Sequence, residues 1–305
     1  MQIGIDLMGG ETSPALLIQA IDELARESDS PLKLTIFASK EVLSKLPQNC
    51  GSVSLTPVVA ADLIEMADDP LKAVRQKPNA SMILGIKALK EGKIDAFVST
   101  GNTGALIASS TLTLGRIESI SMPALLALLP TKKNPLALID AGASTEADTK
   151  QLLASAKMGL AYQYASGNKQ PKIGLLNIGT EEYKGHDALK KAYSQLKNLP
   201  EFVGNIEGSH AFEGKVDVLV TDGFTGNVFL KTAEGVAAML IEQMAEKPKK
   251  LIEKTATGAL VCGVDGIVIK CHGSADPKAL KNGVKLAANL TNGNFLNKLK
   301  SELKR

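Results

Sequence analysis

Six segments of this chain place glycine and small polar residues directly after a short apolar run. They read MGGETSP at 8–14, STGNTGAL at 99–106, DAGAST at 140–145, NIGTEEYKG at 177–185, TDGFTGN at 221–227 and CHGSADP at 271–277. Glycine lets a backbone approach a ligand closely, and a helix that begins in such a turn presents free N–H groups and a partial positive charge. Any one turn is explained more simply as an ordinary strand-to-helix connection with its usual cap residues. All six together favour a rim that binds anions such as phosphate.

Only a few side chains of these turns could take part in chemistry: Asn102, Lys184, Asp222, Asn227 and His272. Inorganic phosphate is already nucleophilic near neutral pH, so an enzyme that uses it needs groups to hold and orient it. A lysine and helix N–H groups suffice for that task. A thiol leaving group would need little help from an acid, because its reference pKa is only about 8.5.

Several common chemistries are excluded by missing motifs. The chain has no G-x-G-x-x-G with an acid after the second strand, no phosphate-binding G-x-x-x-x-G-K-[ST], no G-x-S-x-G and no H-E-x-x-H. Its three histidines are scattered, and Cys50, Cys262 and Cys271 lack the spacing of a zinc site or a disulfide framework. We therefore expect neither a metal nor an organic cofactor, and the cysteines suit a reducing cytoplasm.

The runs before these turns alternate with segments of helical period, which predicts an α/β protein. Strands are expected in IGIDLM, LKLTIFA, DAFVST, LALID, KIGLLNIG, VDVLVTD and GIVIKCH, and helices in 14–26, 82–89, 149–164 and 226–244. This rhythm is typical of a three-layer α/β/α sandwich with a mostly parallel, Rossmann-like sheet, whose ligands bind at the carboxyl ends of the strands. No linker or repeat divides the chain, so a single domain over residues 1–305 is predicted.

Composition and hydropathy exclude further classes of protein. The 305 residues are 44% hydrophobic and 22% charged with a net charge of +3, which fits a folded chain without a nucleic-acid partner. The longest apolar stretch, residues 123–130, is too short to span a membrane, and the N-terminus lacks the regions of a signal peptide. A cytoplasmic protein is expected.

The motifs resemble one family closely, the PlsX family of acyl-ACP:phosphate acyltransferases. The resemblance extends over nearly the whole chain and is most specific in GNTGAL, NIGTEEYKG and DGFTGNV; it also covers IGIDLMGG, DDPLKAVRQKPNASM, LIDAGA, GNIEG and GVDGIVIKCHGSAD. It departs where MGGETSP replaces the family's MGGDHAP, where Ser209 and His210 replace an arginine and an aspartate, and in a helical segment near 236–260 that looks shortened.

The resemblance implies a fold related to phosphotransacetylases, a homodimer without metal or cofactor, and transfer of a long-chain acyl group from acyl-ACP to inorganic phosphate. The acyl phosphate would pass to a membrane glycerol-3-phosphate acyltransferase for phospholipid synthesis. By motif, the catalytic residues would be Lys184, Asp222 and Asn227. The substrate-binding residues would be Gly9, Gly10, Gly101, Asn102, Thr103, Gly104, Gly226 and His272.

Each of these residues also has a plainer explanation. Lys184 could be a solvated lysine at a helix start, and Asp222 could cap the helix that follows. Asn102 and Asn227 could be turn residues in left-handed geometry rather than donors to a thioester oxyanion. Arg75 and Lys77, expected just before a helix near Asn79, could be solvated or could dock the acidic ACP. A covalent intermediate on Cys271 is disfavoured, because a strand-end cysteine is usually a small buried hydrophobe.

The C-terminal segment is a predicted amphipathic helix. Phe295, Leu296, Leu299 and Leu303 fall on one face, and Lys298, Lys300, Lys304 and Arg305 add positive charge. Packing of this helix on the domain is favoured, and weak peripheral contact with the inner face of the cell membrane is the alternative.

Two other functions stay open from the sequence. One is a non-catalytic or altered-specificity relative that binds ACP or acyl phosphate, and the other is a phosphotransacetylase that uses short-chain acyl-CoA. Lys184, Asp222 and Asn227 favour an enzyme over the first, and the motif-by-motif match to the ACP-using family favours the acyltransferase over the second.

Overall fold

The computed structural model describes residues 1–27, 31–47, 51–244, 258–273 and 275–305. They group into two compact units. Unit 1 contains residues 1–116 and 256–292, and unit 2 contains residues 117–255 and 293–305. Each unit is described on its own below.

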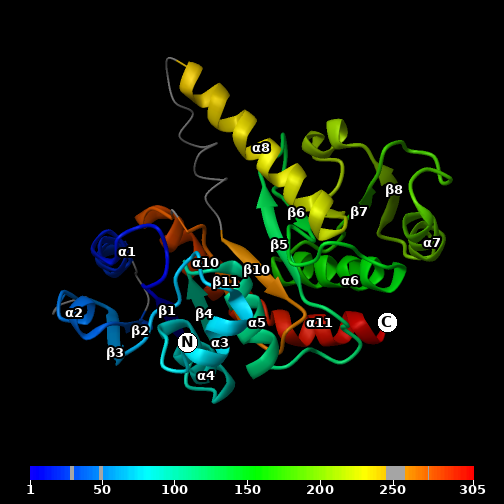
Figure 1. Ribbon diagram of the computed structural model, residues 1–305. Helices are drawn as coiled ribbons and strands as arrows, with labels where there is room; N and C mark the ends of the chain where they lie inside the picture. The colour runs from blue at the N-terminus through cyan, green and yellow to red at the C-terminus, as the bar shows by residue number, and fades with distance from the viewer. Residues whose placement is uncertain (28–30, 48–50, 245–257, 274) are drawn as a thin grey trace. The chain divides into compact units, whose positions relative to one another are not determined.

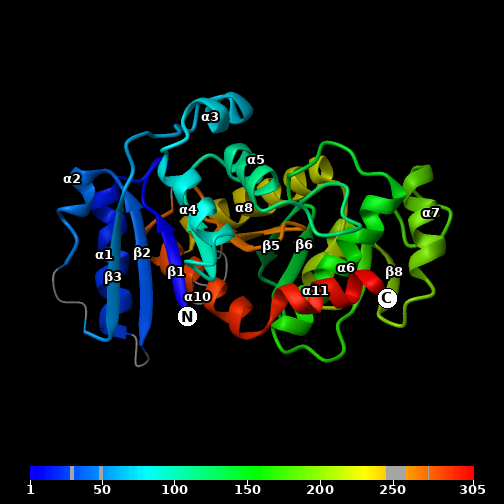
Figure 2. The ribbon, with the colours of Figure 1, turned by 90° about the horizontal axis from the view of Figure 1, so that it is seen from below.

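Unit 1 is built on a mostly parallel sheet with strand order β3-β2-β1-β4-β11-β10. Its neighbouring strands are parallel except the antiparallel pair β10 and β11. Figure 2 shows β1, β2 and β3 side by side. The central strands are apolar and buried on both faces, as expected of a parallel sheet covered by helices. The strands are β1 (Gln2–Asp6), β2 (Leu32–Ala38), β3 (Val53–Val59), β4 (Ala96–Ser99), β10 (Ala259–Cys262) and β11 (Ile267–Lys270).

The longer helices of unit 1 cover this sheet with an apolar side. In α1 the buried residues Leu17, Ala20, Ile21 and Leu24 follow helical spacing. Helix α10 packs on α1 and on β1, β4 and β11, while α4 packs on β1, β2 and β4, and α5 contacts α4 and β11. The helices are α1 (Pro14–Glu27), α2 (Lys40–Leu43), α3 (Pro70–Gln76), α4 (Ser81–Lys90), α5 (Thr103–Thr113) and α10 (Pro277–Asn292).

The strands of unit 2 lie in the order β5-β6-β9-β7-β8, and neighbouring strands are parallel except for the pair β5 and β6. Helix α6 packs on β6, β7 and β9, and α7 and α11 pack on α6. Helix α8 contacts β5 and β6. The strands are β5 (Ala124–Leu129), β6 (Leu136–Ile139), β7 (Ile173–Leu176), β8 (Phe202–Ile206) and β9 (Val218–Val220). The helices are α6 (Thr149–Ala165), α7 (Asp187–Leu196), the 3₁₀ turn η1 (Gly208–Glu213), α8 (Gly223–Gln243) and α11 (Phe295–Lys304).

The predicted α/β class is confirmed, and each predicted strand and helix corresponds to an element. Strands β3, β5, β8 and β10 and helices α2, α3, α5, α7 and α10 are additional elements. The apolar run at 123–130 contains β5, so its apolar character comes from burial in a sheet. None of the described helices is long and apolar enough to cross a membrane.

Helix α8 has its fully buried residues in its first turn. Gly223 and Gly226 are its buried residues, and its second half extends away from the sheet of unit 2 (Figure 1). That half carries exposed apolar side chains at Val236, Met239, Leu240 and Met244. It begins the segment near 236–260 that the sequence predicts to be shortened, of which residues 245–257 lie outside the described part of the chain.

The C-terminal helix α11 packs on α6, which confirms the favoured prediction. Phe295 and Leu299 are fully buried there, and Leu296 and Leu303 are half-buried. Covering of these apolar side chains by the protein disfavours membrane contact through this face, and peripheral membrane contact stays a prediction.

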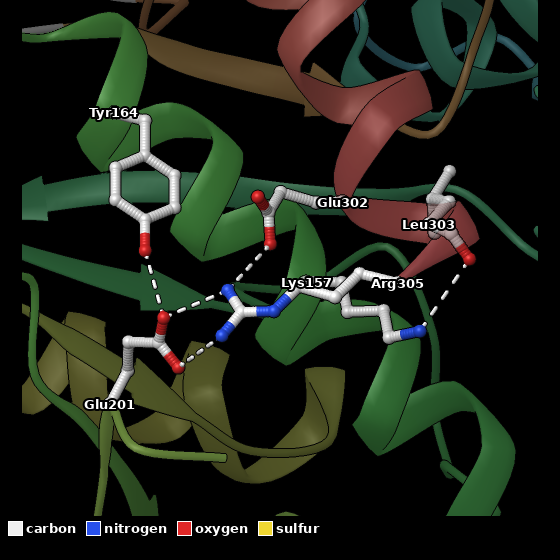
Figure 3. Close-up of polar contacts among 6 residues, drawn as sticks. All are labelled: Lys157, Tyr164, Glu201, Glu302, Leu303 and Arg305. Atoms are coloured by element: carbon white, nitrogen blue, oxygen red, sulfur yellow. Dashed lines mark hydrogen bonds and ion pairs between the residues drawn. The ribbon is translucent and has the colours of Figure 1, made fainter.

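Polar contacts fasten the end of α11 (Figure 3). The Arg305 guanidinium donates to both carboxylate oxygens of Glu201, at 2.8 and 3.3 Å, and the Tyr164 hydroxyl donates to the same carboxylate at 2.9 Å. Lys157 Nζ donates to the Leu303 carbonyl at 3.5 Å. Burial acts to raise the pKa of Glu201, but the contacts from Arg305 and Tyr164 outweigh it and hold that pKa below its usual value.

We expect Arg305→Ala to lower the free energy of unfolding by about 1 kcal/mol at pH 7, because it removes a bidentate ion pair with a mostly buried carboxylate. Because the pKa of Glu201 is lower in the folded than in the unfolded protein, its ionised carboxylate stabilises the folded state at pH values above the unfolded pKa. This stabilisation is lost as the pH falls through the folded pKa. The difference between wild type and variant in urea unfolding should therefore shrink below about pH 4. Lys304→Ala, at an exposed neighbouring position, is the matched control. Identical midpoints for wild type and Arg305→Ala at pH 7 would contradict this account.

Candidate active-site edges

Three of the six glycine-bearing turns leave the same edge of unit 1. Strands β1, β4 and β11 are adjacent and parallel, and their last residues Asp6, Ser99 and Lys270 are paired in register. The turns that follow therefore start side by side. They also touch, because the backbone N–H groups of Glu11 and Thr12 both donate to the Gly273 carbonyl, at 2.7 and 3.2 Å.

The predicted substrate-binding glycines in these turns lie where other atoms approach the backbone closely. Gly9 has a φ of +76°, and a Cβ there would lie 2.5 Å from the Ile64 carbonyl oxygen. A Cβ at Gly10 would lie 2.7 Å from Thr100 Oγ1, and one at Gly101 would lie 2.7 Å from Met82 Cε. A side chain at Gly9 would press on the Ile64 backbone and one at Gly10 on the turn after β4, whereas at Gly101 the end of the flexible Met82 side chain would have to move.

Asn102 is the N-cap of α5, with its side-chain oxygen accepting from Ala105 N at 3.0 Å. Its amide nitrogen donates to the carbonyls of Glu65, Met66 and Asp68, at 3.4, 3.0 and 3.2 Å. Its φ of −54° excludes the left-handed geometry considered from sequence. The amide that was a candidate donor to an oxyanion is thus engaged with backbone carbonyls, and Asn102 fixes the start of α5.

Thr103 and Gly104 form the first turn of α5. The backbone N–H groups of such a turn point out of the helix start and favour anions. Gly104 is also where α3 approaches α5, since a Cβ there would lie 2.7 Å from Pro70 Cγ. This turn keeps the predicted capacity to bind an anion.

The turn after β11 separates an exposed histidine from a buried thiol. His272 is exposed, whereas Cys271 is fully buried. Burial raises the pKa of the Cys271 thiol to about 12, so the reactive thiolate is rare at neutral pH. This agrees with the sequence argument against a covalent intermediate on Cys271.

Unit 2 presents a corresponding edge. Strands β6, β9 and β7 are adjacent and parallel, so the turns after Ile139, Val220 and Leu176 leave on the same side. The first of these turns is organised by the buried Asp140. Its carboxylate accepts from the backbone N–H groups of Leu125, Gly142, Ala143 and Ser144 and from the Ser144 hydroxyl, at 2.8–3.0 Å.

The start of α8 docks directly on the Asp140 turn. Gly223 N donates to Ser144 Oγ at 3.3 Å, and a Cβ at Gly226 would overlap the Asp140 carbonyl oxygen. Asn227 lies in the second turn of α8 and donates its amide to the Ala141 carbonyl at 3.3 Å. The sequence-based alternative of a left-handed turn residue is therefore wrong for Asn227, which is helical.

Asp222 is the N-cap of α8, as the plainer explanation of this residue predicts. One oxygen accepts from Thr225 N at 2.8 Å and the other from Thr225 Oγ1 at 2.7 Å. The carboxylate is half-buried. Capping leaves further acceptor capacity on both oxygens, so the cap does not exclude a second role.

Lys184 lies in the loop after β7, three residues before α7 begins at Asp187, which corrects its expected position at a helix start. The half-buried side chain lies across Gly179, where a Cβ would come within 3.1 Å of its Cγ and Cε. Its ammonium lies 5.6 Å from the centre of the Tyr183 ring. Asn177 holds the loop by donating to the Lys184 carbonyl at 3.1 Å. The loop thus presents a cation on the edge from which Asp222 also emerges.

The two predicted ACP-docking residues have different surroundings. Arg75 is exposed in α3, and Lys77 is the C-cap of that helix rather than part of a loop before α4. Lys77 Nζ pairs with Asp68 at 2.5 Å, and this contact lowers the pKa of Asp68. Arg75 is therefore more accessible to a partner than Lys77.

Sequence reasoning missed Asp6, Lys270, Asp140 and Ser144, which organise these turns. A charged residue at the end of an otherwise apolar strand is the signal that could have found three of them. Among the described residues, no group of three or more histidine, cysteine, aspartate or glutamate side chains is placed to hold a metal ion. The chemistry available at the two edges is anion binding by Lys184 and helix starts, with Asp222 as a general acceptor.

Comparison with known proteins gives close relatives of this chain. A family model described as fatty acid synthesis protein matches residues 1–256. The phosphate acyltransferases of Chlamydia felis and Chlamydia caviae are each 40% identical to it over 314 residues, covering 99% of both chains. That of Chlamydia pneumoniae is 39% identical over 322 residues, also covering 99% of both chains.

Solved structures with the same fold are more distant in sequence. A phosphotransacetylase from Streptococcus pyogenes aligns with a TM-score of 0.65 and 15% identity, covering 97% of this chain and 94% of that one. The EutD phosphotransacetylase from Staphylococcus aureus gives 0.63 and 14%, covering 95% and 94%. The 4-hydroxythreonine-4-phosphate dehydrogenase from Klebsiella pneumoniae gives 0.61 and 11%, covering 95% and 99%. These likenesses establish the fold, which serves different reactions.

We expect Cys271 to resist alkylation in the folded protein, because burial both covers its thiol and suppresses its thiolate. Iodoacetamide at pH 7.5, followed by peptide mass spectrometry, should leave Cys271 unmodified in native protein and modify it fully in urea. Rapid labelling of Cys271 in the native protein would contradict its assigned environment.

Proposed function

The chain belongs to the family described as fatty acid synthesis protein, and on that premise we propose that it is an acyl-ACP:phosphate acyltransferase. It moves a long-chain fatty acyl group from acyl-ACP to inorganic phosphate, giving acyl phosphate for phospholipid synthesis. The observation that carries the proposal is the full-length 40% identity to proteins named phosphate acyltransferase. The loop cation Lys184 and the half-buried Asp222 beside α8 supply groups suited to that reaction.

The proposed reaction needs no covalent enzyme intermediate. A phosphate oxygen attacks the thioester carbonyl carbon, a C–O bond forms and the C–S bond breaks, and the ACP thiol leaves as thiolate and takes a proton from water. Lys184 holds the phosphate and offsets the negative charge of the phosphate and of the thioester oxygen during the attack. Asp222 orients the proton of the phosphate or the Lys184 ammonium, while it continues to cap α8.

The carrier and the partners are proposed on the same basis. ACP is acidic, and the exposed Arg75 on α3 offers it a contact. A homodimer is the proposed assembly. The long-chain acyl phosphate is apolar, so a membrane glycerol-3-phosphate acyltransferase is the proposed downstream partner.

The direct test supplies purified protein with long-chain acyl-ACP and phosphate and traps acyl phosphate with hydroxylamine. Acyl phosphate and free ACP should form together without nucleotide, and EDTA should leave the rate unchanged. Short-chain acyl-CoA, tested in parallel, should be a poor substrate. Dependence on ATP, loss of activity in EDTA or preference for short-chain acyl-CoA would each refute the proposal.

We expect Lys184→Ala and Asp222→Asn each to lower kcat by about 10²-fold or more, because both remove a charge that positions or stabilises the reacting phosphate. Asparagine is as good an N-cap as aspartate, so Asp222→Asn should keep α8 and the thermal stability of the protein. Cys271→Ala is the comparison variant and should retain turnover. Wild-type kcat in Asp222→Asn would limit Asp222 to its capping role.

Arg75→Glu should raise KM for acyl-ACP several-fold without a comparable change in kcat, because a surface charge affects encounter with an acidic partner. The same variant should have an unchanged KM for acyl-pantetheine, which lacks the ACP protein. Lys33→Glu, an equivalent charge reversal at the amino end of β2, is the matched control. An unchanged KM for acyl-ACP in Arg75→Glu would remove α3 from the docking surface.

A further inference from the structure

Three polar side chains form a buried row across the centre of the unit 1 sheet. Asp6, Ser99 and Lys270 are the last residues of β1, β4 and β11, and they are paired in register. Each is almost fully buried, with exposed fractions of 1%, 0% and 6%. Burying a carboxylate and an ammonium at the end of apolar strands costs free energy. The three side chains must therefore make stabilising contacts that apolar side chains could not make.

The carboxylate of Asp6 reaches two of the turns. One oxygen accepts from Met8 N at 2.9 Å and so bends the chain into the turn that carries Gly9 and Gly10. The other accepts from Ser99 Oγ at 2.8 Å. Ser99 Oγ in turn accepts from Gly101 N at 3.1 Å. A single buried carboxylate thereby fixes the backbone after β1 and the backbone after β4.

Lys270 reaches the third turn. Its ammonium donates to the Thr100 carbonyl at 3.2 Å and to the Cys271 carbonyl. It therefore joins the turn after β4 to the turn that carries His272. The turns after β1 and β11 also bond directly, through Glu11 N and the Gly273 carbonyl at 2.7 Å. All three connections converge on the turns that carry the predicted substrate-binding residues of unit 1.

We propose that Asp6, Ser99 and Lys270 are positioning residues that set the mutual geometry of the three substrate-binding turns of unit 1, and that turnover requires the charges of both Asp6 and Lys270. This deepens the proposed function and rests on it. None of the three side chains is assigned contact with substrate. They act through the backbone groups of Met8, Thr100, Gly101 and Cys271.

The charge state of the row changes within an accessible pH range. Burial raises the pKa of Asp6 to about 6, against the lowering effects of hydrogen bonds from Ser81, Met8 and Ser99 and of the Lys270 charge. The groups that face Asp6 are hydroxyls from α4 and β4 and the ammonium from β11, while β2 places Phe37 in register beside it. Activity that needs the Asp6 carboxylate is present above this pKa and is lost as pH falls through it.

The first arm of the test measures backbone hydrogen exchange in the three turns and does not depend on enzyme activity. Hydrogen exchange followed by mass spectrometry at pH 7.5 compares wild type with Asp6→Asn, Lys270→Met and Ser99→Ala. Peptides that contain residues 7–12, 99–104 and 271–273 should exchange faster in the variants. Thr35→Val is the matched control, since Thr35 is a buried hydroxyl of the neighbouring β2 that bonds Gln2 away from the turns. It should leave exchange in the three turns unchanged.

The second arm measures kinetics. Asp6→Asn should lower kcat by about ten-fold or more, because misplaced binding groups cost rate, and it should remove the acidic limb of the pH profile. Lys270→Met should move that limb to higher pH, because it removes a cation that lowers the pKa of Asp6. The double variant should lose less than the product of the two single losses, since neither charge is then left unpaired. Thr35→Val should keep wild-type kcat.

The outcomes separate this proposal from the proposed function. A wild type that makes no acyl phosphate refutes the proposed function. Hydrogen exchange still tests, in that case, whether Asp6, Ser99 and Lys270 position the three turns. Unchanged exchange in both Asp6→Asn and Lys270→Met overturns the proposal, and so does faster exchange with unchanged kcat and pH profile. If Asp6→Asn does not fold, exchange in Ser99→Ala tests the proposal, because this variant removes one hydroxyl and leaves both charges in place. Unchanged exchange in the three turns of Ser99→Ala would then overturn it.

Discussion

The structure depends on how backbone N–H and C=O groups are satisfied where parallel strands end. At that point the ladder stops, and each chain must turn into a helix while its backbone groups are still partly buried. Asp6, Ser99 and Lys270 supply the missing partners in unit 1, and Asp140 and Ser144 supply them in unit 2. With these contacts made, the turns can pack closely enough that only glycine fits at Gly9 and Gly226.

The capacity to bind an anion follows from this arrangement. Because side chains such as Asn102 and Asp222 cap the starts of α5 and α8, both helices begin at defined places on the strand edges. The proposed reaction requires few side chains beyond these folded turns. Phosphate brings its own nucleophilic oxygen and the thioester brings its own leaving group, so a cation on a short loop and an oriented carboxylate suffice. The buried Cys271, whose pKa is raised to about 12, has no part in the proposed reaction.

The sequence predicts the α/β class well because buried parallel strands are short apolar runs and helices such as α1 have a clear apolar stripe. It misses β3, whose outward side chains are exposed and whose fifth residue is Pro57, and β10, which is only four residues long. It identifies the turns but not what each residue does there. Asn102 and Asn227 carry amides suited to an oxyanion, and only the fold reveals that both amides contact backbone carbonyls. The C-terminal helix is equally ambiguous in sequence, since an amphipathic face can meet a membrane or α6.

The central claim is direct transfer of the acyl group from the ACP thioester to phosphate. It is tested most directly by following free ACP thiol and acyl phosphate in one rapid time course, with enzyme at a concentration comparable to that of acyl-ACP, in the presence and absence of phosphate. The account predicts equal amounts of the two products when phosphate is present, and no release of ACP when it is absent. One equivalent of ACP released per enzyme without phosphate would demonstrate an acyl-enzyme and contradict the account.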